Sequence, residues 1–338
     1  MFLCIIIVCT VLVMIYERAT NNNTKEKENF TVVTSFYPMY IAALNIVDGA
    51  DGVTLENLSK PQTGCLHDFQ LTPEDMKLLS TADLFVINGG GIESFMSDVA
   101  KAYPDLTVVE ACKNVELINE SEEDVDTHDH DHEADSDETD HDHDNEADSD
   151  ETDHDHETDS DESGHDHDHG DENAHAWMSV ARYRVMVSTI AESLSKADPS
   201  NAAIYDSNAK KYDAKLAELE EKENEIKQKT AGNDIIIFHE AYEYVADDFG
   251  MNVCYLMDLD EERAVSAGEV SDVINAVRND GVSVILAEEL YGKDLGDTVS
   301  RETDVKMVYI DPLNRGNYDK NSYIEGMEKN FELIEAAF

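Results

Sequence analysis

Basic side chains are scarce in this chain. Its 338 residues include 24 Lys and Arg against 76 Asp and Glu, which gives a formal net charge of −52. Proteins that bind DNA or RNA use clusters of Lys and Arg to neutralise phosphates. We therefore exclude nucleic acid as a partner.

Cysteine is also rare, and no two cysteines have the close spacing of a structural zinc site. Cys4 and Cys9 lie near the N-terminus, and Cys65, Cys112 and Cys254 follow singly. Zinc sites built on cysteine use paired thiolates. The last three are expected to be buried thiols, with one disulfide among them as the alternative.

Long apolar runs are absent except at the N-terminus. Residues 1–16 are almost wholly apolar, but this falls short of the roughly 20 residues that span a bilayer as a helix. An export signal fits better, although no Lys or Arg precedes the run as in a usual signal peptide. Residues 1–29 are therefore assigned as signal or anchor and linker. We expect an exported protein held at the outer face of the cell membrane by a lipid or peptide anchor.

Apolar residues nearly vanish from residues 120–172. This segment holds 28 Asp and Glu and no Lys or Arg, and the rest of the chain carries −24. Such a segment cannot bury enough apolar surface to fold, so it is predicted to be disordered. A thirteen-residue repeat starting at Glu133 and Glu146 interleaves histidine with aspartate. Carboxylates alone suit calcium, whereas imidazole favours Zn, Ni or Cu. We call residues 120–172 the acidic ladder. Weak metal sites are expected at its histidines, which are His128, His130, His132, His141, His143, His154, His156, His165, His167 and His169.

The remaining chain alternates β-branched runs with helical patterns. This rhythm is typical of α/β proteins with parallel sheets covered by helices, and the length favours two lobes. Residues 201–229 lack Pro and Gly and predict one long rigid helix that joins the lobes. Strands are expected at 30–35, 53–57, 82–88, 106–110, 234–238, 252–256, 283–287 and 306–310, and helix starts at Thr72, Glu93 and Ser266. The lobes are assigned to 30–119 plus 173–199 and to 232–338, with the connecting helix at 200–231.

Three histidines stand outside the acidic ladder, at His67, His175 and His239. His67 and His239 each follow a predicted strand, one in each lobe. In doubly wound sheets, ligands bind beyond the carboxyl ends of strands. Neutral imidazole is a favoured zinc ligand, so the three histidines predict one metal site between the lobes.

Six motifs that follow one another along the chain carry a family resemblance. They are Thr34-Ser-Phe-Tyr-Pro38, Gly64-Cys-Leu-His67-Asp-Phe, Asn173-Ala-His175-Ala-Trp177, Phe238-His239-Glu-Ala-Tyr-Glu-Tyr244, Ala287-Glu288 and Ile310-Asp311-Pro-Leu313. Together they resemble the zinc-binding components of bacterial ABC importers, the ZnuA-like substrate-binding proteins. The resemblance covers nearly all of residues 30–338, but the prolines that the family usually has before the first and second histidines are missing here.

The resemblance implies a function and a ligand set. Zn²⁺ would be held by His67, His175 and His239, with Asp311 or water as the fourth ligand and Glu288 orienting a histidine from outside the coordination shell. Manganese relatives carry a carboxylate at the third histidine, so Mn²⁺ is the less favoured metal. The resemblance implies a membrane permease as partner, and we expect the chain to act as a monomer that catalyses no reaction.

Two other functions remain as alternatives. A zinc hydrolase also uses three histidines and a water, here with Glu240 or Glu288 as general base, but the chain has no His-Glu-x-x-His motif. A surface metal buffer or adhesin would depend on the acidic ladder instead.

Overall fold

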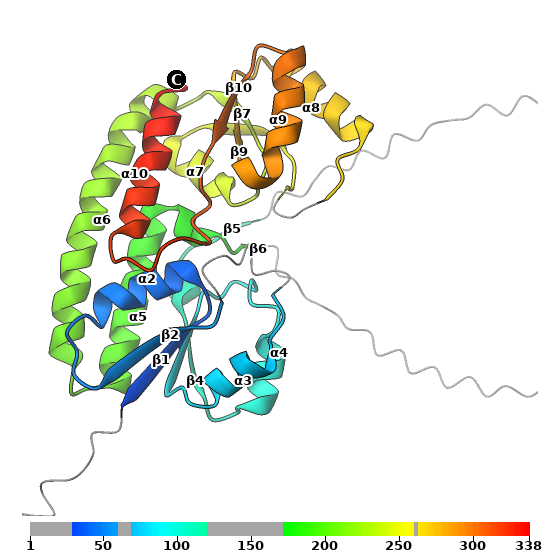
Figure 1. The fold of residues 1–338 in the computed structure, drawn as a ribbon. Coiled ribbons are helices and arrows are strands. Elements are labelled where there is room, and N and C mark those ends of the chain that lie inside the picture. The colour runs from blue at the N-terminus through cyan, green and yellow to red at the C-terminus, as the bar shows by residue number, and fades with distance from the viewer. Residues whose placement is uncertain (1–28, 60–68, 120–171, 260–262) are drawn as a thin grey trace, which may run out of the picture. The chain divides into compact units, whose positions relative to one another are not determined.

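The computed structural model describes residues 29–59, 69–119, 172–259 and 263–338. The N-terminal lobe is built on a four-stranded sheet of order β2-β1-β3-β4, in which every neighbouring pair is parallel. Its strands are short and central β3 is wholly buried, as expected for a sheet covered on both faces. They are β1 (Phe30–Thr34), β2 (Val53–Asn57), β3 (Leu84–Ile87) and β4 (Thr107–Glu110) (Figure 1).

The helices of this lobe are α2 (Tyr37–Ile46), α3 (Pro73–Leu79) and α4 (Met96–Ala102). The predicted start of α3 is confirmed, because Thr72 and Asp75 form a capping box there. The predicted start of α4 at Glu93 is wrong by three residues. The Glu93 carboxylate instead accepts hydrogen bonds from the backbone N–H groups of Asn88 (2.7 Å) and Gly89 (3.1 Å).

The C-terminal lobe repeats the plan with a parallel sheet of order β10-β9-β7-β8. The predicted capping box at Ser266 is confirmed, with Glu269 as its partner. The strands are β7 (Asp234–Ile237), β8 (Asn252–Leu256), β9 (Val284–Ala287) and β10 (Lys306–Tyr309), and the helices are α7 (Tyr242–Phe249), α8 (Ala267–Asp280), α9 (Glu289–Glu302) and α10 (Ser322–Glu335).

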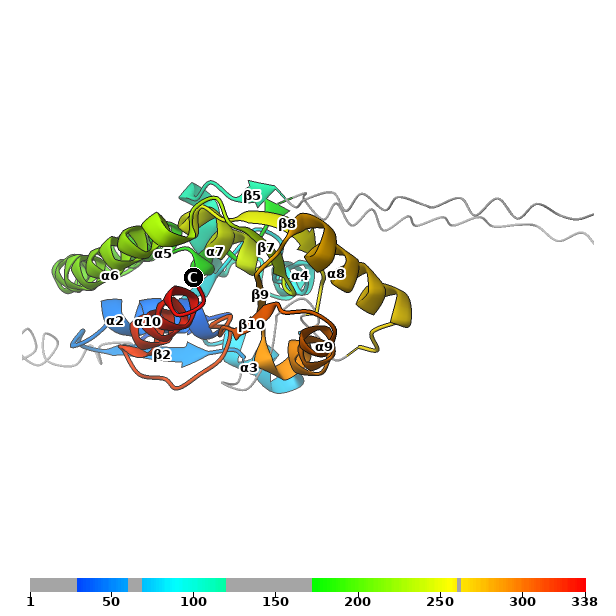
Figure 2. The ribbon, with the colours of Figure 1, turned by 90° about the horizontal axis from the view of Figure 1, so that it is seen from above.

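A helical layer connects the two sheets. The predicted long helix is present as α6 (Ala202–Thr230), which lies beside α5 (Val180–Ala197) and also packs against α2, α7 and α10 (Figures 1 and 2). Its buried side chains recur three, four or seven residues apart, so one face packs inward while charged residues cover the other. One cluster of buried apolar side chains runs from Val32 of β1 through this layer to Ile235 of β7.

These observations confirm the predicted fold class, whereas the exact domain boundaries stay a prediction. The segment 120–171 lies outside the described residues and is flanked by the short antiparallel pair β5 (Ile118–Asn119) and β6 (Glu172–Asn173). The apolar residues 1–16 and the histidines of the acidic ladder also lie outside the described residues. No helix within the described ranges is long and apolar enough to cross a membrane.

The expected buried thiols are found only in part. Cys112 is buried, but Cys254 is exposed: it lies on the edge strand β8, at the register shift with β7 that leaves it without a strand partner. Both thiols are free, so no disulfide joins them. Cys65 lies outside the described residues.

Candidate metal centre

His239 is positioned by the central strand β7 of the C-terminal lobe. The strand ends at Ile237, and the next two residues, Phe238 and His239, are fully buried. The backbone N–H of Ala241 donates to His239 Nδ1 at 3.0 Å. The ring also lies against Tyr242, with 5.5 Å between the ring centres. A rigid strand and a short turn therefore fix this imidazole.

His175 is positioned by the turn between β6 and α5. Its side chain is buried, and its backbone N–H donates to Asn173 Oδ1 at 3.0 Å. Its ring Nδ1 lies 3.0 Å from the same Oδ1 atom and 3.3 Å from Glu240 Oε1. With Nδ1 facing these two oxygens, Nε2 is the ring nitrogen that can bind a metal.

The structure brings these two predicted ligands together. The ring centres of His175 and His239 lie 5.1 Å apart, and the ring planes are nearly perpendicular at 86°. The two residues are 64 positions apart in sequence and come from different lobes. A site between the lobes is the arrangement that the sequence predicts.

Trp177 helps to hold the loop that carries Asp311. Its indole N–H donates to the carbonyl oxygen of Pro312 at 2.8 Å, and its ring packs edge-on against Phe36 with 5.0 Å between ring centres. Leu313, in the same loop, has a positive φ of 53°, a conformation that costs roughly 1 kcal/mol or more for a residue with a Cβ. Surrounding contacts must therefore hold the loop in shape.

The remaining predicted ligands are less closely defined. His67 lies outside the described residues. The Asp311 carboxylate accepts a hydrogen bond from Leu313 N–H at 2.8 Å, and burial raises the pKa of Asp311. Glu288 is buried and forms an ion pair with Arg315. Across the part of the chain that the structure describes, no group of three or more His, Cys, Asp or Glu is placed to hold a metal. The full ligand set, and the role of Glu288, stay predictions.

Asn173 and Glu240 both contact His175 through their side chains, a positioning role that is not predicted from the sequence. Asn173 is two residues before His175 and Glu240 directly follows His239. Their place inside two histidine motifs is the signal that could have found them. Polar residues beside a metal-binding histidine commonly orient its ring.

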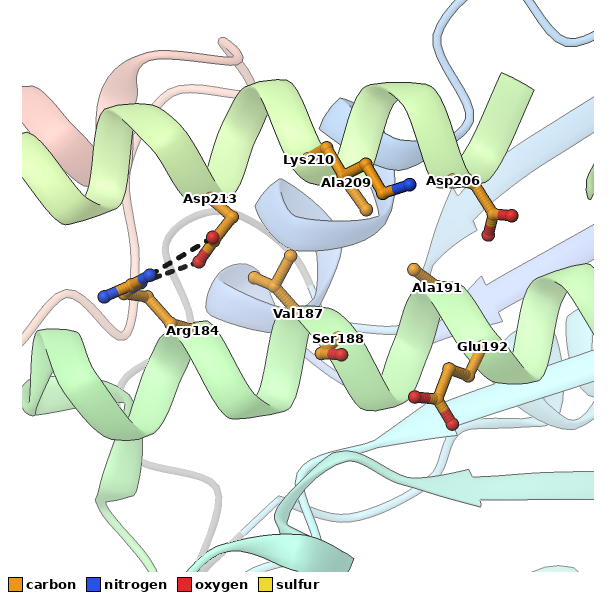
Figure 3. Close-up of a pocket in the computed structure, with 9 residues that line it drawn as sticks. All are labelled: Arg184, Val187, Ser188, Ala191, Glu192, Asp206, Ala209, Lys210 and Asp213. Atoms are coloured by element: carbon orange, nitrogen blue, oxygen red, sulfur yellow. Dashed lines mark hydrogen bonds and ion pairs between the residues drawn. The ribbon is translucent and has the colours of Figure 1, made fainter. Parts of the chain in front are cut away.

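A separate groove lies between α5 and α6 (Figure 3). It has a volume of about 360 Å³, and its lining contains neither His nor Cys. Its Arg184 is paired with Asp213, with 2.6 Å between Nε and Oδ1. The groove therefore offers neither imidazole nor thiolate to a transition metal.

Two α/β lobes that share a helical layer, with buried histidines meeting between them, define the class of two-lobed substrate-binding proteins. Residues 32–337 match the family described as "Zinc-uptake complex component A periplasmic", and the chain belongs to that family. The resemblance predicted from the six motifs is thereby confirmed.

Curated relatives support the same assignment. The chain is 30% identical over 315 residues to the zinc-binding protein AdcA of Streptococcus pyogenes serotype M3, which covers 90% of this chain and 55% of the relative. The chain thus spans about half the length of that relative. It is 26% identical over 326 residues to the high-affinity zinc uptake system protein ZnuA of Bacillus subtilis, covering 93% of this chain and 91% of the relative.

Solved structures show the same fold. The substrate-binding protein FpvC of Pseudomonas aeruginosa, in complex with Ni²⁺, gives a TM-score of 0.69 at 22% identity and covers 91% of this chain and 96% of that one. The Zn(II)-bound ZnuA-like domain of Streptococcus pneumoniae AdcA gives 0.67 at 20% identity, covering 91% and 98%. These similarities confirm the predicted two-lobed α/β fold.

Proposed function

We propose that this protein captures Zn²⁺ between its lobes and delivers it to the membrane permease of an ABC importer, without catalysing a reaction. The observation that carries the proposal is the buried pair His175 and His239. Two imidazoles bound to one tetrahedral zinc at about 2.0 to 2.1 Å place their ring centres about 5 Å apart. The separation of 5.1 Å between the two rings suits a shared zinc ion.

His67, His175 and His239 are the proposed nitrogen ligands, and Asp311 is the proposed fourth ligand, with water as the alternative. Asp311 follows β10 at the carboxyl end of the C-terminal sheet, the same end at which His239 follows β7. Glu288 is proposed to lie outside the coordination shell and to orient a histidine ligand. Isothermal titration of the metal-free protein with Zn²⁺ tests the stoichiometry, and one tight site per chain is expected.

Zinc is proposed over manganese because an imidazole at position 239 suits a borderline-soft cation better than a hard one. Relatives of this chain are named for zinc, iron and manganese, so the choice rests on this chain's own donors. Competition between Zn²⁺ and Mn²⁺ at equal free concentrations tests it. Retention of Mn²⁺ in preference to Zn²⁺ would refute the assignment.

The acidic ladder is proposed to raise the local cation concentration near the cleft through weak, exchanging sites. We propose that the protein collects zinc outside the cytoplasm and is attached to the membrane through its N-terminus. Cells that carry a chain lacking residues 121–169 should take up zinc more slowly when a chelator is present. Unchanged uptake would remove this role from the ladder.

A further inference from the structure

Asn173 lies at a junction of the fold. It is the last residue of β6, which pairs with β5 on either side of segment 120–171. Its exposed fraction is 0%. Its side-chain oxygen faces both the backbone N–H and the ring Nδ1 of His175, each at 3.0 Å. One buried amide therefore touches a proposed zinc ligand twice.

The other polar atoms of Asn173 reach the C-terminal lobe. Its amide nitrogen donates to the carbonyl oxygen of Glu240 and to Glu243 Oε2, both at 2.9 Å. Its backbone carbonyl accepts from the hydroxyl of Tyr244 at 2.5 Å, and the same hydroxyl accepts from Ile118 N–H of β5 at 3.1 Å. Asn173 thus links the β5–β6 pair, His175 and the start of α7.

These contacts also fix which way the amide points. Both partners of the Asn173 amide nitrogen are acceptors, so a rotated amide would set its oxygen against two other oxygens. The side-chain oxygen must therefore face His175. Because an amide oxygen can only accept, Nδ1 of His175 carries the proton and Nε2 keeps its lone pair.

We propose that Asn173 is the positioning residue that holds the His175 ring with Nδ1 protonated and Nε2 directed to the metal, and that it ties this orientation to α7 of the opposite lobe. The proposal rests on the proposed zinc function. Glu240 Oε1 is the weaker partner of Nδ1, since it lies farther away at 3.3 Å and its side chain is 20% exposed.

Two substitutions separate the two parts of this role. Asn173→Ala removes the oxygen beside Nδ1 and both amide donors. Asn173→Asp keeps an oxygen beside Nδ1 but loses both donors and sets a second carboxylate against Glu243. Asn201→Ala is the matched control, because Asn201 is also buried (4% exposed) and its amide bonds to Asp198 and Asp51 instead.

The first measurement is ¹⁵N NMR of histidine-labelled, metal-free full-length protein at pH 7.5, with the His175 signal assigned by its loss in His175→Gln. We expect Nδ1 of His175 to be protonated in the wild type, in Asn173→Asp and in Asn201→Ala. Asn173→Ala should show a mixture of tautomers. The second measurement is zinc affinity by chelator competition, in which Asn173→Ala should weaken binding about 10- to 100-fold, the range typical of residues that orient a metal ligand, and Asn201→Ala should not.

An unchanged tautomer together with a zinc affinity within about twofold in Asn173→Ala would overturn the proposal. If Asn173→Ala does not fold by circular dichroism, Asn173→Asp decides, and loss of the Nδ1 proton there refutes it. If the wild type binds no zinc, the proposed function fails, whereas the spectrum of the metal-free protein still tests the orientation of His175.

Discussion

His175 and His239 are buried. Contacts at the ring atom Nδ1 set the position of each imidazole. Asn173 and Glu240 face this atom of His175, and the backbone of Ala241 donates to this atom of His239. Burying a polar ring without a partner is costly. The contacts at Nδ1 reduce that cost and leave the two rings close enough to share an ion.

Single substitutions at these rings should abolish tight binding. We expect His175→Ala or His239→Ala to weaken zinc affinity by more than about 100-fold, which exceeds the usual effect of residues outside the coordination shell. Chelator competition measures the change. His128→Ala, which removes one histidine of the acidic ladder, is the control and should leave the tight site intact.

Zinc binding should also depend on pH, because a protonated imidazole has no lone pair for a metal. Affinity is expected to be highest at neutral pH and to fall as the pH drops through and below about 6.5. The same competition assay between pH 7.5 and 5 tests this expectation. An unchanged affinity across this interval would argue against histidine ligands.

At the scale of elements, sequence patterns predict most of the architecture because each element depends on local signals. The strands β2 and β8 have the bounds that their β-branched runs predict, and α3 and α8 begin at capping boxes visible in the sequence. Two expectations failed where hydrogen bonding and strand pairing, rather than the apolar pattern, decide. Glu93 bonds back to the turn after β3, and α4 begins later. Cys254 is exposed on the edge strand β8, where the register with β7 shifts and skips this residue.

The candidate site was predictable only in part, because local signals in the sequence identify its motifs but not their long-range contacts. The motifs identify His175 and His239 and their opposite lobes, but not the contacts around them. That Asn173 reaches Glu240, 67 residues away, depends on how β6 packs against α7. No local pattern in the sequence encodes such a contact.

An acidic pair between α6 and α7 makes the fold sensitive to pH. Burial, followed by the charge of Asp248, raises the pKa of Glu223 to about 8, and burial raises the pKa of Asp248 to about 6. Arg182 of α5 lies 3.3 Å from Asp248 and partly offsets the second shift. In the folded chain both carboxyls therefore hold their protons more tightly than carboxyls in an unfolded chain do.

A raised carboxyl pKa stabilises the fold at low pH, and this contribution is lost as the pH rises through the folded pKa. We therefore expect the melting temperature to fall between pH 6 and 9. Glu223→Gln, which stays neutral, should raise the melting temperature at pH 8 by at least about 2 °C and flatten the profile. The exposed Glu225→Gln on the same helix is the control. A profile that is flat in the wild type, or unchanged by Glu223→Gln, would contradict this account.

At the scale of the whole molecule, the lobes share a core, and the insertion is attached at one short strand pair. Core side chains of both sheets belong to one buried cluster with α5 and α6 between them. The ends of segment 120–171 are joined by β5 and β6. We therefore expect the two lobes to fold without the acidic ladder.

A chain in which a short Gly/Ser linker replaces residues 121–169 should fold and keep its tight zinc site. Loop length has a small effect on stability, about 0.6 kcal/mol for each doubling. Titration calorimetry should show that the weak sites disappear while the tight site changes by less than about threefold. Loss of tight binding would favour the surface buffer or adhesin instead.

The most direct test of the central claim is diffraction from zinc-loaded crystals on both sides of the zinc absorption edge. One strong anomalous peak is expected between the lobes, about 2.0 to 2.1 Å from one ring nitrogen of each of His67, His175 and His239, with an oxygen of Asp311 or water completing the shell. A zinc ion bound elsewhere, without His175 and His239, would contradict the account.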